Sequence, residues 1–364
     1  MRLSTHSQRL ERWIGAEQAE AVSLKTKGWY GPPIPLANVP GRVYVTGSGD
    51  FVGPIRGGYY ACLADYVYEK QKRVFRNWSR RQDSTLNTGF ASLSDLISEA
   101  TTGGKSQSLV YHKTGVQVSA AAASAHLWAR GAMPSAGANA AAAPGGTIPT
   151  NTTTGGLKQA DPAGADTLHL TTWTGVESNY SNSLMLYDYT FGVNNSLNAT
   201  NTAVTGVPTR YQTTDAAGSF VSARVTTVLS ATATNLTVTY MDQDGNVAEA
   251  APAIAARASS AVETIPLTEP DWFIPLASGD TGVRKITNVQ SSGANTGVVD
   301  WMICHPLAIM ISPATNSGAV IDGINSAFSL VEIKTGACLA FMEYLKGTTS
   351  AGASYHGLIK LVSG

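Results

Sequence analysis

The stretch Asp271–Ile311, DWFIPLASGDTGVRKITNVQSSGANTGVVDWMICHPLAIMI, contains the densest apolar run of the chain and its clearest turn signals. Three apolar runs separated by the turns ASGDTG and SSGANTG predict three strands, at residues 272–276, 283–290 and 298–311. The third run is apolar at odd and even positions alike, which is typical of a central strand covered on both faces. Pro306 within it predicts a bend or an edge position, because proline has no N–H to donate.

Period-two alternation dominates residues 165–364 and predicts more short strands. Leu168 and Leu170 alternate with polar neighbours, as do Leu236 and Val238. Short alternating segments separated by Gly-rich turns are typical of antiparallel sandwiches and barrels. We therefore predict a mainly β protein whose residues 165–364 form a jelly-roll-like antiparallel sandwich. The expected core includes Leu236, Val238, Trp301, Ile303 and Phe341.

The region before residue 165 is expected to be extended and partly helical. Residues 28–40 contain four prolines and two glycines, so residues 1–40 read as an extended docking arm. Residues 41–119 predict a small α+β region, and the Ala-, Gly-, Pro- and Thr-rich residues 120–164 predict a loop or linker with a short helix around 120–129. Other helices are expected at Ser7–Val22, Tyr59–Phe75 and Ser92–Ala100, the last with a capping-box pattern formed by Ser92 and Asp95.

Composition favours a chain that lies against other surfaces. The 364 residues have no formal net charge and only 14% are charged, against roughly 25% in an average soluble domain. Residues 1–110 carry 14 Lys and Arg against 9 Asp and Glu, a net charge of +5, and the remainder carries −5. This asymmetry would let copies attract one another. A neutral extracellular β-protein has the same composition and stays an alternative.

The cysteines and the N-terminus bear on the compartment. Cys62, Cys304 and Cys338 are odd in number and far apart, so they do not predict a disulfide framework, and the last two read as small buried thiols. That pattern fits folding in a reducing compartment. The N-terminus lacks the apolar core of a signal peptide, and no apolar run approaches the ~20 residues of a membrane span. We expect no membrane partner.

Two loops resemble ligand-binding motifs but have simpler explanations. Val43–Gly53 resembles a Gly-rich phosphate loop, yet Pro54 and further glycines follow where a helix should begin, so a structural turn is favoured. Asp242, Asp244 and Asn246 resemble the start of a calcium loop, but Ala253 stands where the bidentate Glu belongs. An Asp-Gly hairpin turn is the better interpretation.

A basic segment, EKQKRVFRNWSRR at Glu69–Arg81, is the candidate interface of the N-terminal region. Its cations could neutralise phosphates while Phe75 and Trp78 stack on bases. A helix end with two inward aromatics, or docking onto an acidic protein neighbour, explains it more simply. The candidate residues for contact with protein or nucleic acid are Lys70, Lys72, Arg73, Arg76, Arg80 and Arg81.

No pattern of catalytic residues emerges. The six histidines form no metal-binding spacing, and Cys304 and His305 should point to opposite faces of one strand, which is unsuitable for a catalytic pair. We therefore predict no enzyme activity, no cofactor and no metal. A hydrolase built on a β-sandwich from scattered residues stays a less favoured alternative.

Several blocks resemble virion structural proteins of tailed bacteriophages: Val43–Gly58, PDWFIPLASGDTGVRKITNV, GVVDWMICHPLAIM and the closing GACLAFMEYLKGTTS and GLIKLVSG. The resemblance implies assembly through extended arms and flat sandwich faces, with copies of the chain and capsid or tail proteins as partners. It implies a place in the virion, after assembly in the bacterial cytoplasm. We expect a capsid-associated decoration, cement or minor head protein.

Two other virion roles stay open. One is a tail, baseplate or carbohydrate-binding receptor protein. The other is a major capsid protein, but the major capsid fold of many tailed phages includes a long charged spine helix, and the sequence shows no such helix.

Overall fold

The computed structural model describes residues 90, 92–101, 103–116, 123–178, 183–268, 271–311, 316–324, 330–345 and 354–364, together with five two-residue strands before them. The chain divides into two compact units, Met1–Leu86 and Asn87–Gly364. Each is described by itself below. The predicted helices Ser7–Val22 and Tyr59–Phe75 and the basic segment lie outside the described residues, except that Tyr59 belongs to a strand.

The described part of the first unit consists of two small antiparallel sheets. Strands β1 (Ile34–Pro35), β2 (Tyr44–Val45) and β3 (Phe51–Val52) form one sheet, and β4 (Pro54–Ile55) pairs with β5 (Gly58–Tyr59). Tyr44 is opposite Val52, so the Gly-rich stretch connects two paired strands. A strand rather than a helix follows this loop, which agrees with the structural-turn interpretation.

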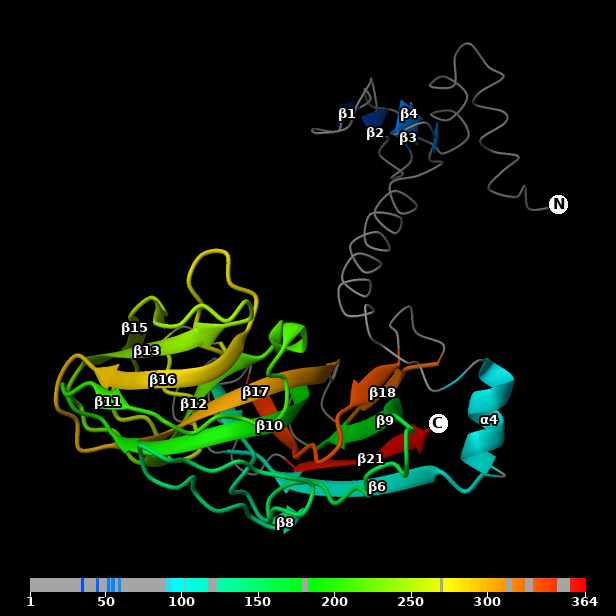
Figure 1. The fold of residues 1–364 in the computed structure, drawn as a ribbon, viewed down its shortest axis with the longest axis horizontal. Coiled ribbons are helices and arrows are strands. Elements are labelled where there is room, and N and C mark those ends of the chain that lie inside the picture. The colour runs from blue at the N-terminus through cyan, green and yellow to red at the C-terminus, as the bar shows by residue number, and fades with distance from the viewer. Residues whose placement is uncertain are drawn as a thin grey trace. The chain divides into compact units, whose positions relative to one another are not determined.

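The second unit is built around two sheets with matching strand orders (Figure 1). The sheet that we call the middle sheet has the order β12 (Phe220–Thr227), β17 (Val298–Ile311), β10 (Ser183–Ser196), β20 (Leu339–Leu345) and β7 (Ala123–His126). The one that we call the outer sheet has the order β18 (Gly318–Asp322), β9 (Leu168–Glu177), β21 (Ser354–Ser363), β6 (Ser106–Thr114) and β8 (Ala132–Met133), and β19 (Val331–Ile333) also pairs with β9.

The connections between these sheets form a jelly roll. Each of the pairs β6–β7, β9–β10, β17–β18 and β20–β21 is consecutive among these eight strands and has one member in each sheet. The members occupy corresponding places, because the order β18-β9-β21-β6 matches the order β17-β10-β20-β7. Two antiparallel ribbons therefore wrap around one core, as in jelly rolls. The mainly β, jelly-roll-like sandwich predicted from alternation is confirmed.

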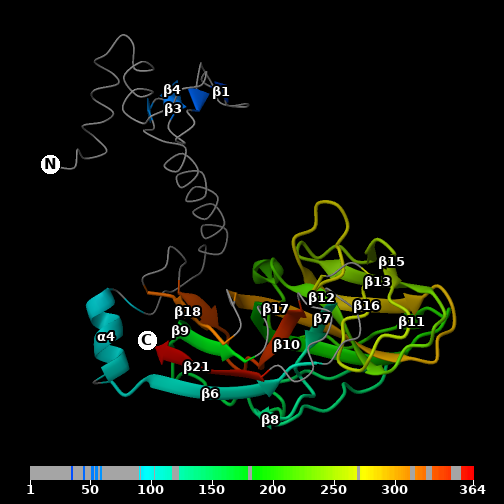
Figure 2. The ribbon, with the colours of Figure 1, turned by 180° about the vertical axis from the view of Figure 1, so that it is seen from behind.

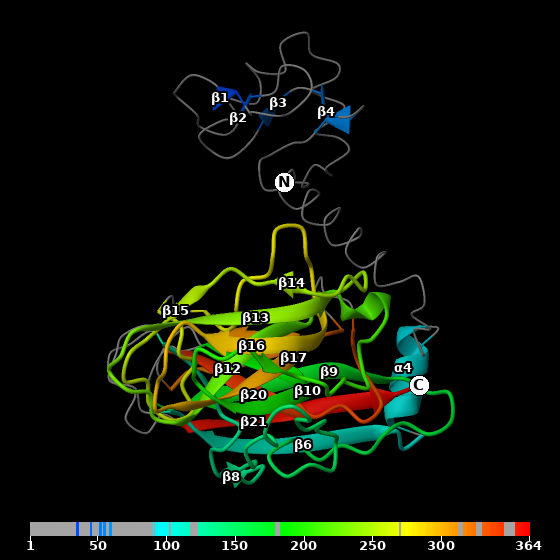
Figure 3. The ribbon, with the colours of Figure 1, turned by 60° about the vertical axis from the view of Figure 1, so that its left-hand side comes forward.

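Residues 197–297, between β10 and β17, form an insertion in the jelly roll. Its strand β12 extends the middle sheet beside β17. The others form a third sheet, and Figure 3 shows the middle sheet between β13 and β16 on one side and β21 and β6 on the other. The third sheet contains β11 (Thr202–Ala203), β16 (Val283–Ser291), β13 (Thr234–Asp242), β14 (Glu249–Ala250) and β15 (Ile254–Ala256).

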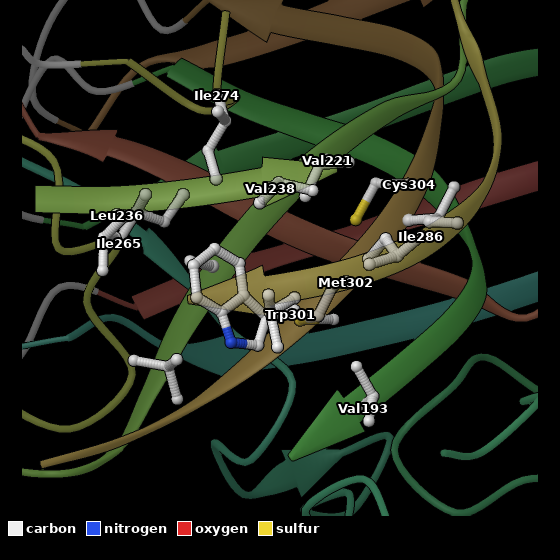
Figure 4. Packing of buried hydrophobic residues seen from close by; sticks show 14 of the residues in the cluster. Val193, Val221, Leu236, Val238, Ile265, Ile274, Ile286, Trp301, Met302 and Cys304 are labelled. Atoms are coloured by element: carbon white, nitrogen blue, oxygen red, sulfur yellow. The ribbon is translucent and has the colours of Figure 1, made fainter. Parts of the chain in front are cut away.

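Two apolar clusters separate the sheets, and the alternation of β10 explains both. Leu184 and Leu186 belong to the cluster against the outer sheet, while Met185 and Tyr187 belong to the cluster that also contains third-sheet residues. All five predicted core residues are at most 1% exposed. Phe341 lies in the outer-sheet cluster, and the third-sheet cluster, drawn in Figure 4, contains Leu236, Val238, Trp301 and Ile303.

Strand β17 is the central strand that its two-sided apolar pattern predicts. It pairs with β10 on one side and β12 on the other, and each residue of Val299–Cys304 is at most 1% exposed. Strand β12 begins at Phe220, opposite Cys304, and the pairing of β17 with β10 shifts next to Pro306. Pro306 therefore lies beyond the last β12 partner and beside a bulge, in agreement with its predicted position.

Two local predictions are wrong. The predicted strand at 272–276 is irregular: the Ile274 N–H donates to the Val221 carbonyl at 2.8 Å, but Pro275 has no N–H to extend such pairing. The short helix expected around 120–129 is a strand instead, because Ala123–His126 pair with β20. Tertiary pairing overrides the helix preference of alanine there. Strands β6, β7 and β8 thus lie in the same two sheets as the strands after residue 165.

The helix expected at Ser92–Ala100 is confirmed as α4 (Leu93–Thr101). The Asp95 N–H donates to Ser92 Oγ at 3.1 Å, which is the N-terminal cap that the sequence indicates. Figures 1 and 2 show α4 next to one end of β21 and β6. Leu96 is buried, while Leu93 and Ile97 are 56% and 54% exposed.

Candidate assembly surface

The outer sheet buries one face and exposes the other. Along β6, Leu109, Tyr111 and Lys113 are buried, while the intervening Val110 is 57% exposed. Since side chains alternate between the faces of a strand, strand register shows which residues of other strands share the exposed side. Val110 is opposite Leu358, which is opposite Thr174, and Thr174 is opposite Val320.

This register makes two rows across the exposed side, and we call their residues the open face. The second row contains Met133, His112, His356 and Val176. Neither row contains Lys, Arg, Asp or Glu. Several of its apolar side chains are strongly exposed, with Val320 at 67%, Met133 at 52% and Val176 at 45%. The open face consists of Val110, His112, Met133, Thr174, Val176, Val320, His356 and Leu358.

The next row along the strands contains charged side chains. Lys360 is opposite Thr172, and Thr172 is opposite Asp322, so a cation and an anion lie two strands apart in one row. The Asp322 carboxylate accepts the Ile324 N–H at 2.9 Å, which holds it at the end of β18. This row bounds an uncharged area with one group of each sign.

The histidine pair is the titratable feature of the open face. The rings of His112 and His356 stack with their centroids 4.0 Å apart and an angle of 19° between their planes. Desolvation lowers the pKa of His356, and the neighbouring His112 lowers it further. Both effects favour the neutral form of His356, and a proton gained there would put charge in the middle of an apolar area.

The interior of the unit contains a buried ionic network that fixes the edge of the middle sheet. Arg224 on β12 is opposite Asp300 on β17, and its guanidinium donates to that carboxylate. It also donates to Glu263 Oε1 at 2.6 Å and to Asn139 Oδ1 at 2.9 Å. The three charged side chains are at most 4% exposed. The network therefore ties two loops to the sheet without presenting charge to solvent.

A buried carboxyl lies beside the outer-sheet cluster. Glu343 on β20 is fully buried and accepts the Tyr355 O–H and the Val116 N–H, both at 2.6 Å. Burial, with a smaller contribution from Glu177, raises the pKa of this carboxyl to about 7 against the opposing effects of the two hydrogen bonds and of Arg130. Glu343 therefore takes up a proton near neutral pH in the folded state and only near pH 4.5 in the unfolded chain.

This difference predicts that acid stabilises the fold through Glu343. Stability from a raised pKa is fully present below the unfolded value and is lost as pH rises through the folded value. We expect Glu343 to contribute up to ~3 kcal/mol more to the free energy of unfolding at pH 5 than at pH 8, at 1.36 kcal/mol per pKa unit. Denaturant unfolding of the wild type and of Glu343→Gln across this range measures it. Equal pH dependence in the two proteins would contradict the assignment, because histidine titrations are common to both.

The loop that resembles the start of a calcium loop is the hairpin turn that the sequence predicts. Strands β13 and β14 pair around it, and the Asp242 carboxylate accepts the Asp244 N–H at 2.9 Å and the Asn246 N–H at 2.8 Å. The Asn246 side-chain amide also donates to this carboxylate, at 2.7 Å. Against the opposing effect of burial, this bond and the backbone bonds lower the pKa of Asp242, and the carboxylate is engaged in holding the turn. Among the described residues no group of three or more His, Cys, Asp or Glu side chains is arranged to bind a metal ion.

The described histidines off the open face are held in polar contacts. His126 is fully buried, with Nδ1 2.9 Å from the Tyr187 hydroxyl and Nε2 2.9 Å from Ser222 Oγ. Because Ser222 donates to the Trp272 carbonyl, it accepts from Nε2, which assigns the proton of the neutral imidazole to that nitrogen. Desolvation lowers the pKa of His126 and keeps it neutral.

Cys304 and His305 point to opposite faces of β17, as predicted. Cys304 is buried in the third-sheet cluster, whereas His305 stacks on Tyr211 at 3.9 Å and contacts Ser219 Oγ through Nδ1 at 2.9 Å. Burial lowers the pKa of His305 to about 4. Ser219 is 0% exposed, so this Ser–His contact is closed to a substrate in the described conformation. Cys304 and Cys338 are buried free thiols, in agreement with the prediction.

The predicted contact residues of the basic segment lie outside the described residues, and the open face was missed. Its signal was present in the sequence, because residues 354–362 and 108–112 are apolar or aromatic at both odd and even positions. That pattern in a sheet with only one buried face indicates an exposed apolar surface. Of the helices that the structure describes, none is long and apolar enough to cross a membrane.

Comparisons with known proteins assign no family. No family model and no curated protein matches the chain. The chain is weakly similar to structures of infectious bursal disease virus, including its Gt strain, with 9% identity, coverage of 71% of this chain and 81% of that chain, and a TM-score of 0.16. For T=1 particles of a mutant VP2 protein, the identity is 9%, the coverage is 73% of this chain and 83% of that chain, and the TM-score is 0.17. For the VP2 subviral particle, the identity is 10%, the coverage is 73% of this chain and 85% of that chain, and the TM-score is 0.15. Likenesses at these scores are too weak to assign the fold or the function.

Proposed function

We propose that this chain is a virion structural protein that assembles with copies of itself and with capsid proteins. The observation that carries the proposal is a jelly roll whose outer sheet leaves an uncharged, apolar face open to solvent. Exposed apolar patches on an otherwise folded domain are typical of protein interfaces. The jelly roll is shared by viral capsid, lectin and cupin domains, so it supports the class only by analogy.

The sequence supports the finer assignment, a bacteriophage decoration, cement or minor head protein. Low charge, Ala-, Gly-, Ser- and Thr-rich composition and the blocks that resemble phage virion proteins all favour flat contacts in an assembly. Small side chains lose little conformational entropy when such contacts form. The proposal includes no catalytic step: the chain acts by bridging neighbours, and many modest contacts add through multivalency.

The test is the position of the protein in purified particles. We expect a labelled chain distributed over the capsid shell, and we expect particles stripped of it to release their DNA at a lower temperature than intact ones. Thermal release monitored with a DNA-binding dye measures this. A label confined to the tail tip, with loss of adsorption and unchanged shell stability, would replace the shell assignment with a tail or receptor-binding one. Absence from particles would refute the virion proposal.

A further inference from the structure

The open face of the jelly roll has a composition that fits a second copy of itself. Its two rows contain no charged side chain, and the row beside them contains Lys360 and Asp322, one charge of each sign. Flat apolar areas with a polar boundary are typical of protein interfaces. A twofold contact brings the same patch together from both subunits, so each patch must be complementary to itself.

The register of the outer sheet shows how this complementarity arises. The strands lie in the order β18, β9, β21, so β9 is equidistant from its two neighbours. A twofold axis along β9 would set β21 of one copy over β18 of the other. Lys360 would then face the partner's Asp322, and Leu358 would face the partner's Val320. Val176 lies on β9 itself and would face its own equivalent.

We propose that two copies pair through their open faces about a twofold axis along β9, and that protonation of His356, which stacks on His112, separates them. The partner is a second copy of this chain, which adds detail to the proposed function. The pairing rests on that function only for its biological setting. The contact is neutral while both imidazoles are neutral. Burying an unpaired imidazolium in an apolar interface is strongly unfavourable, so acid favours the separated copies.

The groups around the pair leave such a charge without a nearby anion. Strand β8 contributes Ala132 and Met133 beside His112, and β9 contributes Val176 beside His356. Among the described strand residues on this side, the nearest charged side chains are Lys360 and Asp322, in the third row. Lys113 and Glu177, on the neighbouring positions, are buried on the other face of the sheet. Desolvation and the neighbouring His112 lower the pKa of His356, which agrees with a site that disfavours the charged imidazole.

Sedimentation velocity of the full chain tests the pairing. We expect dimers at pH 7.5 and monomers at pH 5.0, with unchanged far-ultraviolet circular dichroism at both pH values. Val176→Asp places two like charges against each other and should raise the dimer Kd by roughly 100-fold, because each carboxylate is buried without a partner. Val247→Asp is the matched control: Val247 is 62% exposed and lies off the open face, so this variant should dimerise as the wild type does.

His356→Gln separates pairing from its control by acid. This variant should dimerise at pH 7.5 and remain mostly dimeric at pH 5.0. Glutamine cannot take up a proton in this pH range, so acid no longer places a charge at position 356 in the interface. Equal acid dissociation of His356→Gln and the wild type would overturn the role of the pair. A wild type that is monomeric at pH 7.5, or a Val176→Asp variant that pairs as the control does, would overturn the interface.

The two proposals fail separately. If the chain occupies the shell of particles but never pairs through the open face, the function stands and this inference falls. If the purified chain pairs as described but is absent from particles, the pairing stands and the virion role falls.

Discussion

Replacing Arg224 by alanine is expected to destabilise the second unit by ~3–5 kcal/mol, the range measured when one partner of a buried ion pair is removed. The guanidinium is 0% exposed and contacts two carboxylates, Asp300 and Glu263, which are at most 4% exposed. Without Arg224 both buried carboxylates would lose the only cation that the described residues place in ion-pair contact with them, although Arg130 still acts on Glu263. Arg224 lowers the pKa of Glu263 against the raising effect of burial, so its loss should raise that pKa and lead the carboxyl to take up a proton.

Denaturant unfolding at pH 7.5 and pH 5 measures this effect. The destabilisation of Arg224→Ala relative to wild type should shrink at pH 5, because a protonated Glu263 carboxyl loses less than a carboxylate when the guanidinium is removed. Arg257→Ala is the control: that side chain is partly exposed and donates to the Thr268 carbonyl at 3.4 Å, so the expected loss is below ~1 kcal/mol. Equal losses in the two variants, or a loss at Arg224 that does not change with pH, would show that the network is not the source of stability.

Replacing Trp301 by alanine is expected to cost ~3–5 kcal/mol, because the indole is fully buried and a cavity remains where the site cannot collapse. Trp301 lies on the central strand between Val193 of β10 and Ala223 of β12. Its indole N–H has no hydrogen-bond partner among the described residues, so the loss comes from apolar contacts and not from a broken hydrogen bond.

The size of the loss should follow the volume removed. Trp301→Phe retains an aromatic ring and should cost clearly less than Trp301→Ala, whereas Val247→Ala, at an exposed position, should change stability by less than ~0.5 kcal/mol. Melting and denaturant unfolding of the three variants give the comparison. A loss below ~1 kcal/mol for Trp301→Ala would place that side chain at a surface rather than in the core.

Local patterns in the sequence determined which segments are strands and where several turns lie. The two-sided apolar run of Val298–Ile311 predicts a central strand because a strand must cover both faces with apolar side chains to be buried on both sides. Asp244 and the following Gly245 predict the hairpin turn, and Ser92 predicts the start of α4, because these effects act over four residues or fewer. Such interactions form within short stretches of sequence, so they can be predicted without knowledge of the rest of the chain.

Tertiary structure alone decided the strand order, the strand at Ala123–His126 and the open face. Alanine-rich β7 is a strand because it pairs with the edge of β20. The local helix preference of alanine gives no indication of this pairing. The open face joins residues from β6, β8, β9, β18 and β21, and the stacked pair His112 and His356 comes from opposite ends of the second unit's sequence. Alternation shows that a strand has two kinds of face, but only the pairing of distant strands determines which side is covered by a core and which is left to meet another surface.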